Sequence, residues 1–315
     1  MEWRPILSSD AHTWADLLAT IREADKDWEI FTVDDLLEEF DDPLRDFEHD
    51  SMAVFDGEMM VAYGVLRVRT EANPVHDMRY EGGVHPQFRG SGIGSELNTW
   101  AEYGAIRLHA EHFPNSPLSL SASCTSTNLG ALEFFERRTF RAIRWFNGMT
   151  RDLATPVVED PNPPGIEIFD WTPQLSFEAL QVRNEAFRDH WGSTTTTPEG
   201  WDHFVGSAAF RPDHSYLAMA DSEAVGVIVC HEYETGPDAK GRDLYVSIVG
   251  TKNGYRKRGI ATALLERALI SAGAAGFVTA SLEVDAASAT GAFGLYEGLG
   301  FRIDHTSIVV TKSLV

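Results

Sequence analysis

The spacing of apolar residues predicts a pair of helices near the start of each half of this chain. In segment 10–21 the apolar side chains recur three and four positions apart, which places them on one helical face: Trp14, Leu17, Leu18 and Ile21. Segments 34–40, 177–187 and 198–204 are predicted helices by the same reasoning. The two halves therefore open in the same way.

Extended segments follow these helices in both halves. Residues 52–65 and 216–229 each read as a β-hairpin, because two apolar runs are separated by an aspartate and a turn residue. Four more strands are predicted at 78–84, 119–124, 244–249 and 279–284. The expected fold class is α/β, with a mixed, mostly antiparallel sheet flanked by helices in each half.

A glycine-rich turn leads into a core-facing helix in each half. The turns are Arg89-Gly90-Ser91-Gly92-Ile93-Gly94 and Arg256-Lys257-Arg258-Gly259-Ile260-Ala261. The helices that follow, at 92–108 and 260–269, carry apolar residues near helical spacing. Backbone N–H groups and the positive end of a helix dipole converge at such a turn, so each turn is a candidate phosphate site. One turn alone is equally well a sharp strand-to-helix connection, but its recurrence favours the phosphate site.

The order of hairpin, turn, helix and a late aromatic-rich helix recurs in both halves, which predicts two domains. A proline-rich stretch at 159–165 lies near the midpoint and is compatible with neither a helix nor a central strand. We therefore expect an N-terminal domain over residues 1–157, a linker over 158–165 and a C-terminal domain over 166–315.

Composition narrows the class of partner. The 315 residues include 26 Lys and Arg against 48 Asp and Glu, a net charge of −22, which argues against nucleic acid or an anionic membrane as a partner. The two cysteines, Cys124 and Cys230, provide no disulfide framework, and no metal-ligand spacing of histidines occurs. With no leader-like or membrane-spanning stretch, we expect a cytoplasmic protein without a metal, either a monomer or a homodimer.

Both turns fit the pattern Arg or Gln, two residues, Gly, one residue, Gly or Ala, in which the sequence resembles the GNAT superfamily of N-acetyltransferases. The approach segments 83–88 and 250–255 and the closing segments 128–135 and 292–301 are also similar to that family. The resemblance covers nearly the whole chain as two tandem copies. With Asn184-Glu185-Ala186-Phe187 early in the second copy, it is similar to the mycothiol synthase branch.

The resemblance implies transfer of an acetyl group from acetyl-CoA directly to the primary amine of a small molecule, in a ternary complex. It also implies that coenzyme A binds at the two turns and their approaches. The residues expected to bind it in the second copy are Val249, Gly250, Thr251, Arg256, Lys257, Arg258, Gly259, Ile260, Ala261 and Thr262. Those in the first copy are Gly83, Val84, His85, Arg89, Gly90, Ser91, Gly92, Ile93, Gly94 and Ser95.

The two copies differ in the residue expected to act on the leaving sulfur. The resemblance implies a tyrosine in the closing helix as the acid, and Tyr296 matches it. The first copy has Phe135 there, which has no proton to give. An asparagine near the start of that helix is kept as Asn128 but is replaced by Ala289 in the second copy. We therefore expect the second half to be catalytic and the first half to be catalytically incomplete.

The general base is open among several groups. Many relatives place a glutamate in the strand before the turn, where the second copy has Tyr245, with Asp243 two residues away on the same strand face. Asp243 and Tyr245 are therefore candidate catalytic residues beside Tyr296. Other carboxylates on neighbouring predicted strands are Glu232, Glu234, Glu283 and Asp285, and in the first copy Glu81. The missing strand glutamate weighs against a mycothiol synthase activity.

Two other functions remain open: a non-catalytic acyl-CoA binding protein or sensor, and an acetyltransferase acting on protein amines. A dehydrogenase does not fit, because a dinucleotide fingerprint spaces its glycines differently and requires an acidic residue about 20 positions further on.

Overall fold

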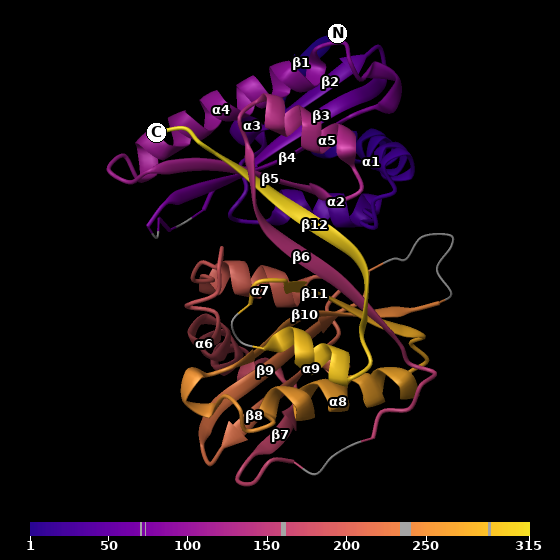
Figure 1. Ribbon diagram of the computed structural model, residues 1–315, viewed down its shortest axis with the longest axis vertical. Helices are drawn as coiled ribbons and strands as arrows, with labels where there is room; N and C mark the ends of the chain where they lie inside the picture. Colours follow the sequence, from indigo (N-terminus) through magenta and orange to yellow (C-terminus); the bar gives the residue numbers. More distant parts are fainter. Residues whose placement is uncertain (70, 73, 159–161, 234–240, 289–290) are drawn as a thin grey trace. The chain divides into compact units, whose positions relative to one another are not determined.

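The computed structural model describes residues 1–315 except 70, 73, 159–161, 234–240 and 289–290. The described chain forms two compact units (Figure 1). The first unit consists of Met1–Trp145 and Ser307–Val315, and the second unit consists of Phe146–Thr306. The predicted boundaries at 157 and 166 divide the chain linearly, and they stay a prediction.

Among the described residues, the first unit consists of six hydrogen-bonded strands, part of β12 (Arg302–Ser313) included, with helices packed against them. Its elements are β1 (Glu2–Arg4), α1 (Ala11–Asp25), α2 (Val33–Asp41), α3 (Phe47–Asp50), β2 (Ser51–Asp56), β3 (Met59–Arg67), β4 (His76–Val84), α4 (Ile93–His112), β5 (Leu118–Thr125) and α5 (Leu129–Arg137). The strand order is β1-β2-β3-β4-β5-β12, where only part of β12 (Arg302–Ser313) belongs to this unit. Strands β4 and β5 are parallel, and the other paired strands are antiparallel.

The second unit repeats this arrangement. Its elements are β7 (Glu167–Asp170), α6 (Ser176–Ala186), α7 (Pro198–Gly206), β8 (Tyr216–Ala220), β9 (Glu223–His231), β10 (Asp243–Thr251), α8 (Ile260–Ala274), β11 (Thr279–Asp285) and α9 (Ala292–Gly298). The strand order is β7-β8-β9-β10-β11-β6, where part of β6 (Arg141–Asp152) belongs to this unit. Here β10 and β11 are the parallel pair. The mixed, mostly antiparallel sheet flanked by helices confirms the predicted fold class.

Each half supplies the last strand of the other half's sheet. Residues 307–313 of β12 pair with β5, from Ser307 opposite Thr125 to Ser313 opposite Ser119. Residues 146–152 of β6 pair with β11, from Phe146 opposite Asp285 to Asp152 opposite Thr279. The strands β6 and β12 each run through both units. The first unit is therefore formed from two separate stretches of chain, whereas the second is the single range Phe146–Thr306.

Alternating strand residues build two apolar layers in the second unit. Val225, Ile228 and Cys230 of β9 pack in a cluster with the apolar face of α8, and Val227 and Val229 pack in a second cluster with α6 and α7. These side chains are at most 1% exposed. The first unit has the same division, with α4 and α5 in one cluster and α1 and α2 in another. Each fully buried Val, Leu or Ile contributes about 1.5–3 kcal/mol, so these layers fix the strands that carry the site.

The predicted helices and hairpins all form, and several extend further than predicted. The helix expected at 92–108 continues to His112, and that expected at 260–269 continues to Ala274. The short elements β1, α3 and β7 were not predicted.

Candidate acyl-transfer site

The turn before α8 presents a helix N-terminus with no side chain capping it. Gly259 is the N-cap residue of α8, with φ of +80°, and no side chain accepts a hydrogen bond at this cap. Gly92 holds the same position before α4, with φ of +99°. The first N–H groups of a helix have no partner within the helix, so both turns offer donors to an anion.

The space around these glycines fits a phosphate that approaches the backbone closely. A Cβ added at Gly90 or Gly92 meets no atom within 4 Å, and one added at Gly259 meets only Pro163, at 3.6 Å. Lys257 and Arg258 are exposed beside Gly259 and supply positive charge. The second turn therefore suits the diphosphate of coenzyme A both in shape and in charge.

The two motif arginines point away from the turn and clamp it to the preceding elements. Arg256 donates to the backbone oxygens of Thr251 (3.3 Å) and Ala186 (2.8 Å), the latter at the end of α6. Arg89 donates to the oxygen of Val84 (3.1 Å) and forms a two-bond ion pair with Asp25 at the end of α1 (2.6 and 2.9 Å). These side chains hold the turn in place, and their predicted contact with coenzyme A stays a prediction.

The remaining residues predicted to bind coenzyme A lie at strand ends or on the first helical turns. In the second unit, Val249, Gly250 and Thr251 end β10, whereas Ile260, Ala261 and Thr262 begin α8. In the first unit, Gly83 and Val84 end β4 and are followed by His85, Ser91 lies in the turn, and Ile93, Gly94 and Ser95 begin α4. The structure thus brings each predicted set together around one turn.

The parallel strands separate just before each turn. Strands β10 and β11 pair only from Asp243 opposite Thr279 to Tyr245 opposite Ser281, although β10 continues to Thr251. In the first unit β4 and β5 pair from His76 opposite Leu118 to Arg79 opposite Ser121, although β4 continues to Val84. The strand edges beyond these pairs suit an extended chain with amide groups, such as the pantetheine arm of coenzyme A.

A β-bulge distinguishes the second unit from the first at this point. Val246 pairs with Cys230 and Ile248 with Val229, so Ser247 is an extra residue in β10. In the first unit the register of β3 and β4 is continuous from Arg67 opposite Arg79 to Ala62 opposite Val84. A bulge leaves its extra residue outside the ladder and re-aims side chains, and bulges are common beside active sites. Sequence reasoning missed it, although β10 has one residue more between Asp243 and Gly250 than β4 has between Asp77 and Gly83.

Tyr296 lies in α9 within the core cluster that also contains the apolar face of α8. Its side chain is 7% exposed, and its ring meets Phe301 edge-on at 6.0 Å between centroids. Burial raises the pKa of the Tyr296 phenol well above its ordinary value, so it keeps its proton and can act as a hydrogen-bond donor. In the first unit Phe135 packs on Phe140 with the rings tilted at 58° and 5.2 Å between centroids.

Asp243 lies at the opposite end of β10 from the turn. Its carboxylate accepts hydrogen bonds from Thr279 Oγ1 (2.6 Å) and from the hydroxyl of Ser281. Gly250 lies seven positions further along the strand, roughly 23 Å away at about 3.3 Å per residue. Asp77 makes the same contacts with Ser119 and Ser121 in the first unit, at 2.6 Å each. This shared arrangement joins the parallel strands where they begin, and the structure does not bring Asp243 to the turn.

The other candidate bases have contacts that occupy them. Glu232 is held by Arg211 (2.7 Å) and Arg242 (2.6 and 2.7 Å), and these hydrogen bonds, Arg242 first, lower its pKa to about 2. Glu81 forms an ion pair with Arg67.

Three further candidates lie on β10 and β11. The ring of Tyr245 meets that of Tyr233 at 5.8 Å, Glu283 faces Gly148 across the β11–β6 pair, and Asp285 is buried and accepts from the backbone of Ala287 (2.9 Å).

Two residues named in the predictions for the base and the closing helix are not described by the structure, whereas a third, Asn128, is. Glu234 and Ala289 lie outside the described residues, as do residues 159–161 of the expected linker. Asn128 caps α5, with its side-chain oxygen accepting from the backbone of Ala131 at 3.0 Å.

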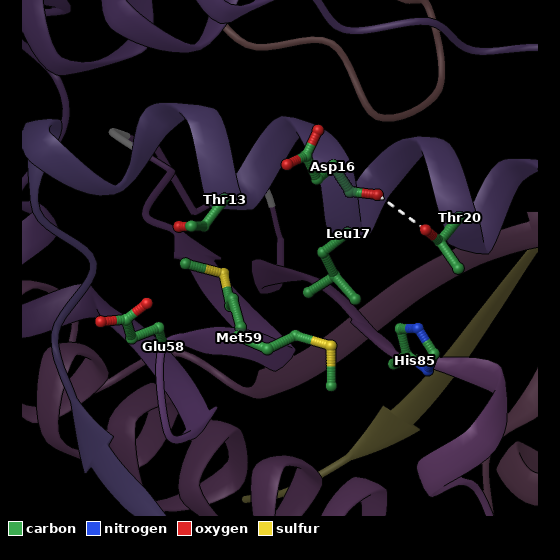
Figure 2. A pocket seen from close by; sticks show the side chains of 8 residues that line it. Thr13, Asp16, Leu17, Thr20, Glu58, Met59 and His85 are labelled. Carbon is green, nitrogen blue, oxygen red and sulfur yellow. Dashed lines mark hydrogen bonds between the residues drawn. The ribbon is translucent and has the colours of Figure 1, made fainter.

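A cavity of about 330 Å³ opens beside α1 in the first unit (Figure 2). It is lined by Thr13, Asp16, Leu17, Thr20, Glu58, Met59, Met60 and His85. Figure 2 shows Leu17 and Met59 pointing into the space, with Glu58 and His85 at its two ends. His85 connects this cavity to the first turn, because it directly follows β4.

Two features are absent from the described residues. No group of three or more His, Cys, Asp or Glu is placed to hold a metal ion there. None of the described helices is both long enough and apolar enough to cross a membrane.

The fold and the comparisons support an acyltransferase of the GNAT type. Residues 177–301, all within the second unit, match the Acetyltransferase (GNAT) family. The resemblance seen in the sequence is thereby confirmed, and acyl transfer is the class of reaction that the comparisons support.

Three relatives illustrate the match. The chain is 28% identical over 258 residues to mycothiol acetyltransferase of Thermobispora bispora, covering 79% of each protein. It is 25% identical to the GCN5-related N-acetyltransferase from Sphaerobacter thermophilus, with a TM-score of 0.78 over 99% of this chain and 95% of that one. A tandem GNAT protein from the clavulanic acid biosynthesis pathway shares the fold, with a TM-score of 0.76, 15% identity and coverage of 100% and 98%.

Proposed function

We propose that the second unit is an acetyl-CoA-dependent N-acetyltransferase that acylates the primary amine of a small molecule. The first unit keeps the turn and the separated strands without the rest of the site, and it serves as a binding or supporting unit. Acetyl-CoA, when bound, supplies the thioester that the amine attacks.

The observation that carries this proposal is the bulge at Ser247, at the point where β10 and β11 part. A backbone group outside the ladder can donate a hydrogen bond to a carbonyl oxygen as negative charge develops on it. The first unit has a continuous register here. The unit with the bulge is also the unit that has Tyr296 rather than Phe135, so two differences support the same assignment.

The residues of the second unit divide the work of binding and proton handling. The N–H groups at the start of α8, with Lys257 and Arg258, hold the diphosphate. The edge of β10 beyond its pairing with β11 orients the pantetheine arm of acetyl-CoA, which carries the thioester. The Tyr296 hydroxyl donates a hydrogen bond to the leaving sulfur, a task that suits a phenol whose pKa is raised by burial.

The proposed acceptor class rests on the relatives. The relative from Thermobispora bispora is named for mycothiol, which makes a cysteinyl amino-sugar the first acceptor to test. Amino acids, aminoglycosides and polyamines complete the panel, because the net charge of −22 is compatible with cationic amines.

The test is free-thiol release from acetyl-CoA with this panel, using the wild type beside Tyr296→Phe. Release that depends on the amine and falls in the variant supports the proposal. Binding of acetyl-CoA without release from any amine would instead favour a sensor or a macromolecular acceptor.

A further inference from the structure

A serine and a histidine form a hydrogen-bonded pair at the bulge. Ser247 Oγ lies 2.8 Å from Nδ1 of His231, which is the last residue of the neighbouring strand β9. The other ring nitrogen, Nε2, lies 3.2 Å from the backbone oxygen of Phe204. A carbonyl oxygen only accepts, so the proton of a neutral imidazole must be on Nε2. Nδ1 is then an acceptor, and the Ser247 hydroxyl donates to it.

The surroundings of His231 hold the ring in this orientation. Its side chain is 1% exposed and is packed among Phe204 (4.5 Å between ring centroids), Phe210 (5.6 Å) and Tyr233, which stacks on it at 5.8 Å and 4°. Ser247, in contrast, is only half-buried. The hydroxyl of Ser247 is thus the polar link between a substrate on this face of β10 and the enclosed imidazole.

The bulge explains why Ser247 faces His231. In an unbroken strand successive side chains point to opposite faces. Here Ser247 contacts His231, and the next residue, Ile248, packs against the same cluster around α6 and α7. The extra residue therefore turns the serine toward the face where His231 lies.

The first unit has no such pair among its described residues. Arg67 ends β3 as His231 ends β9, and it is engaged with Glu81 and Glu39. The strand β4 has no residue corresponding to Ser247, because its register is continuous. The Ser–His pair thus occurs in the same unit as the bulge and Tyr296.

We propose that Ser247 and His231 form the proton path that deprotonates the acceptor amine, a role that rests on the proposed acetyltransferase function. As the amine nitrogen bonds to the acyl carbon, its N–H bond breaks and the proton passes to Ser247 Oγ. The serine's own proton passes to Nδ1 of His231, and Nε2–H stays on the oxygen of Phe204. The carbon–sulfur bond breaks and the sulfur takes up one proton from solvent. The imidazolium returns its proton to solvent through Ser247, so the numbers of protons gained and lost are equal.

In this scheme Ser247 touches the substrate, and His231 is a positioning residue that acts through it. Among the described residues, the polar, charged and titratable groups that face His231 include Arg211, Tyr233 and Ser247, with Tyr245 opposite it on β10. Burial lowers the pKa of His231 to about 4, which keeps the imidazole neutral at neutral pH and leaves the lone pair of Nδ1 facing Ser247.

The chain offers a matched control for losing this kind of hydrogen bond. Ser271 Oγ lies 2.8 Å from Nδ1 of His214, a second buried histidine of the same unit, away from the bulge. Ser271→Ala removes a Ser–His hydrogen bond of the same length without touching the proposed path. Ser247→Thr, in turn, keeps the hydroxyl on β10.

The kinetic test compares kcat, and the Kd of acetyl-CoA, in these variants. We expect Ser247→Ala and His231→Gln to lower kcat by about 10²-fold or more, with the Kd of acetyl-CoA unchanged. Ser247→Thr should restore most of the turnover, and Ser271→Ala should match the wild type. Equal turnover in Ser247→Ala and Ser271→Ala would overturn the proposal. No amine-dependent thiol release from the wild type would instead overturn the underlying function.

A spectroscopic test is independent of turnover. The ¹⁵N shifts of the imidazole report which nitrogen carries the proton. We expect His231 of the wild type to be neutral at pH 7 with the proton on Nε2, and Ser247→Ala to change the shift of Nδ1 selectively. A proton on Nδ1 in the wild type would exclude the path, because Nδ1 could then not accept one from Ser247.

Discussion

The ring of Tyr296 meets that of Phe301 edge-on, at 6.0 Å between centroids, five residues further along the chain. Phe135 and Phe140 form the corresponding pair in the first unit. Either tyrosine or phenylalanine can therefore pack at this position of the closing helix. The two units differ there by one hydroxyl group.

Tyr296→Phe is therefore expected to separate activity from stability. Turnover should fall by about one to three orders of magnitude, because the hydrogen bond to the leaving sulfur is lost. The midpoint of thermal unfolding should change little, since the phenyl ring fills the same space. Kinetics and calorimetry on the same sample check this, and a large loss of stability with full turnover per folded molecule would contradict it.

Gly259→Glu is expected to abolish binding of acetyl-CoA to the second unit. The side chain brings bulk and negative charge to the position where the diphosphate approaches, and φ of +80° adds strain. Gly92→Glu is the matched variant, with φ of +99° in the first unit. Titration calorimetry should show that binding to the second unit is lost in the first variant, and the thiol-release assay should show that transferase activity is kept in the second. The opposite pattern would place the chemistry in the first unit.

Glu232 is expected to contribute to stability in a pH-dependent way. Its folded pKa of about 2 lies below the ordinary value of 4.5, so its contribution is fully present above about pH 4.5 and is lost as the pH falls toward 2. Glu232→Gln should therefore unfold at a lower temperature than the wild type at pH 6, and the two should converge near pH 2. A difference that is constant with pH would mean that the ion pairs with Arg211 and Arg242 do not cause it.

Removing residues 307–315 is expected to unfold the first unit, although its other residues end at Trp145. Ile308 and Val310 are 8% and 4% exposed in its core cluster, and β5 loses one of its two partner strands, keeping only β4. Each of the two side chains is worth about 1.5–3 kcal/mol. Hydrogen exchange should show lost protection in β5. Removal of Val315 alone is the control, and retained protection in the longer truncation would contradict the strand pairing.

The sequence predicted the turns, the hairpins and the closing helices because each depends on local signals. Gly92 and Gly259 mark positive φ at a helix start, and apolar spacing marks the helix faces. Because the pattern occurs twice, the two copies could also be compared. That comparison showed Tyr296 in the second copy where the first copy has Phe135.

Pairing between distant strands could not be predicted in the same way. Nothing in residues 307–313 distinguishes β5 as the partner, because an alternating strand fits any apolar sheet edge of suitable register. The motif also could not predict where the side chains of Arg89 and Arg256 point, because their partners lie at the ends of α1 and α6. The sequence does show one extra residue in β10. Only the pairing register of β9 and β10 identifies Ser247 as that residue.

The exchange of β6 and β12 means that a protein cut at the proline-rich stretch would yield two fragments with unsatisfied sheet edges. Each fragment would carry a long final strand whose partner is on the other fragment, and exposed edges of this kind promote association. Two such fragments mixed in solution would be expected to complement one another. A single-copy chain with the same final strand could pair that strand with the sheet of a second copy, forming a strand-swapped dimer. The tandem chain corresponds to such a dimer joined into one polypeptide.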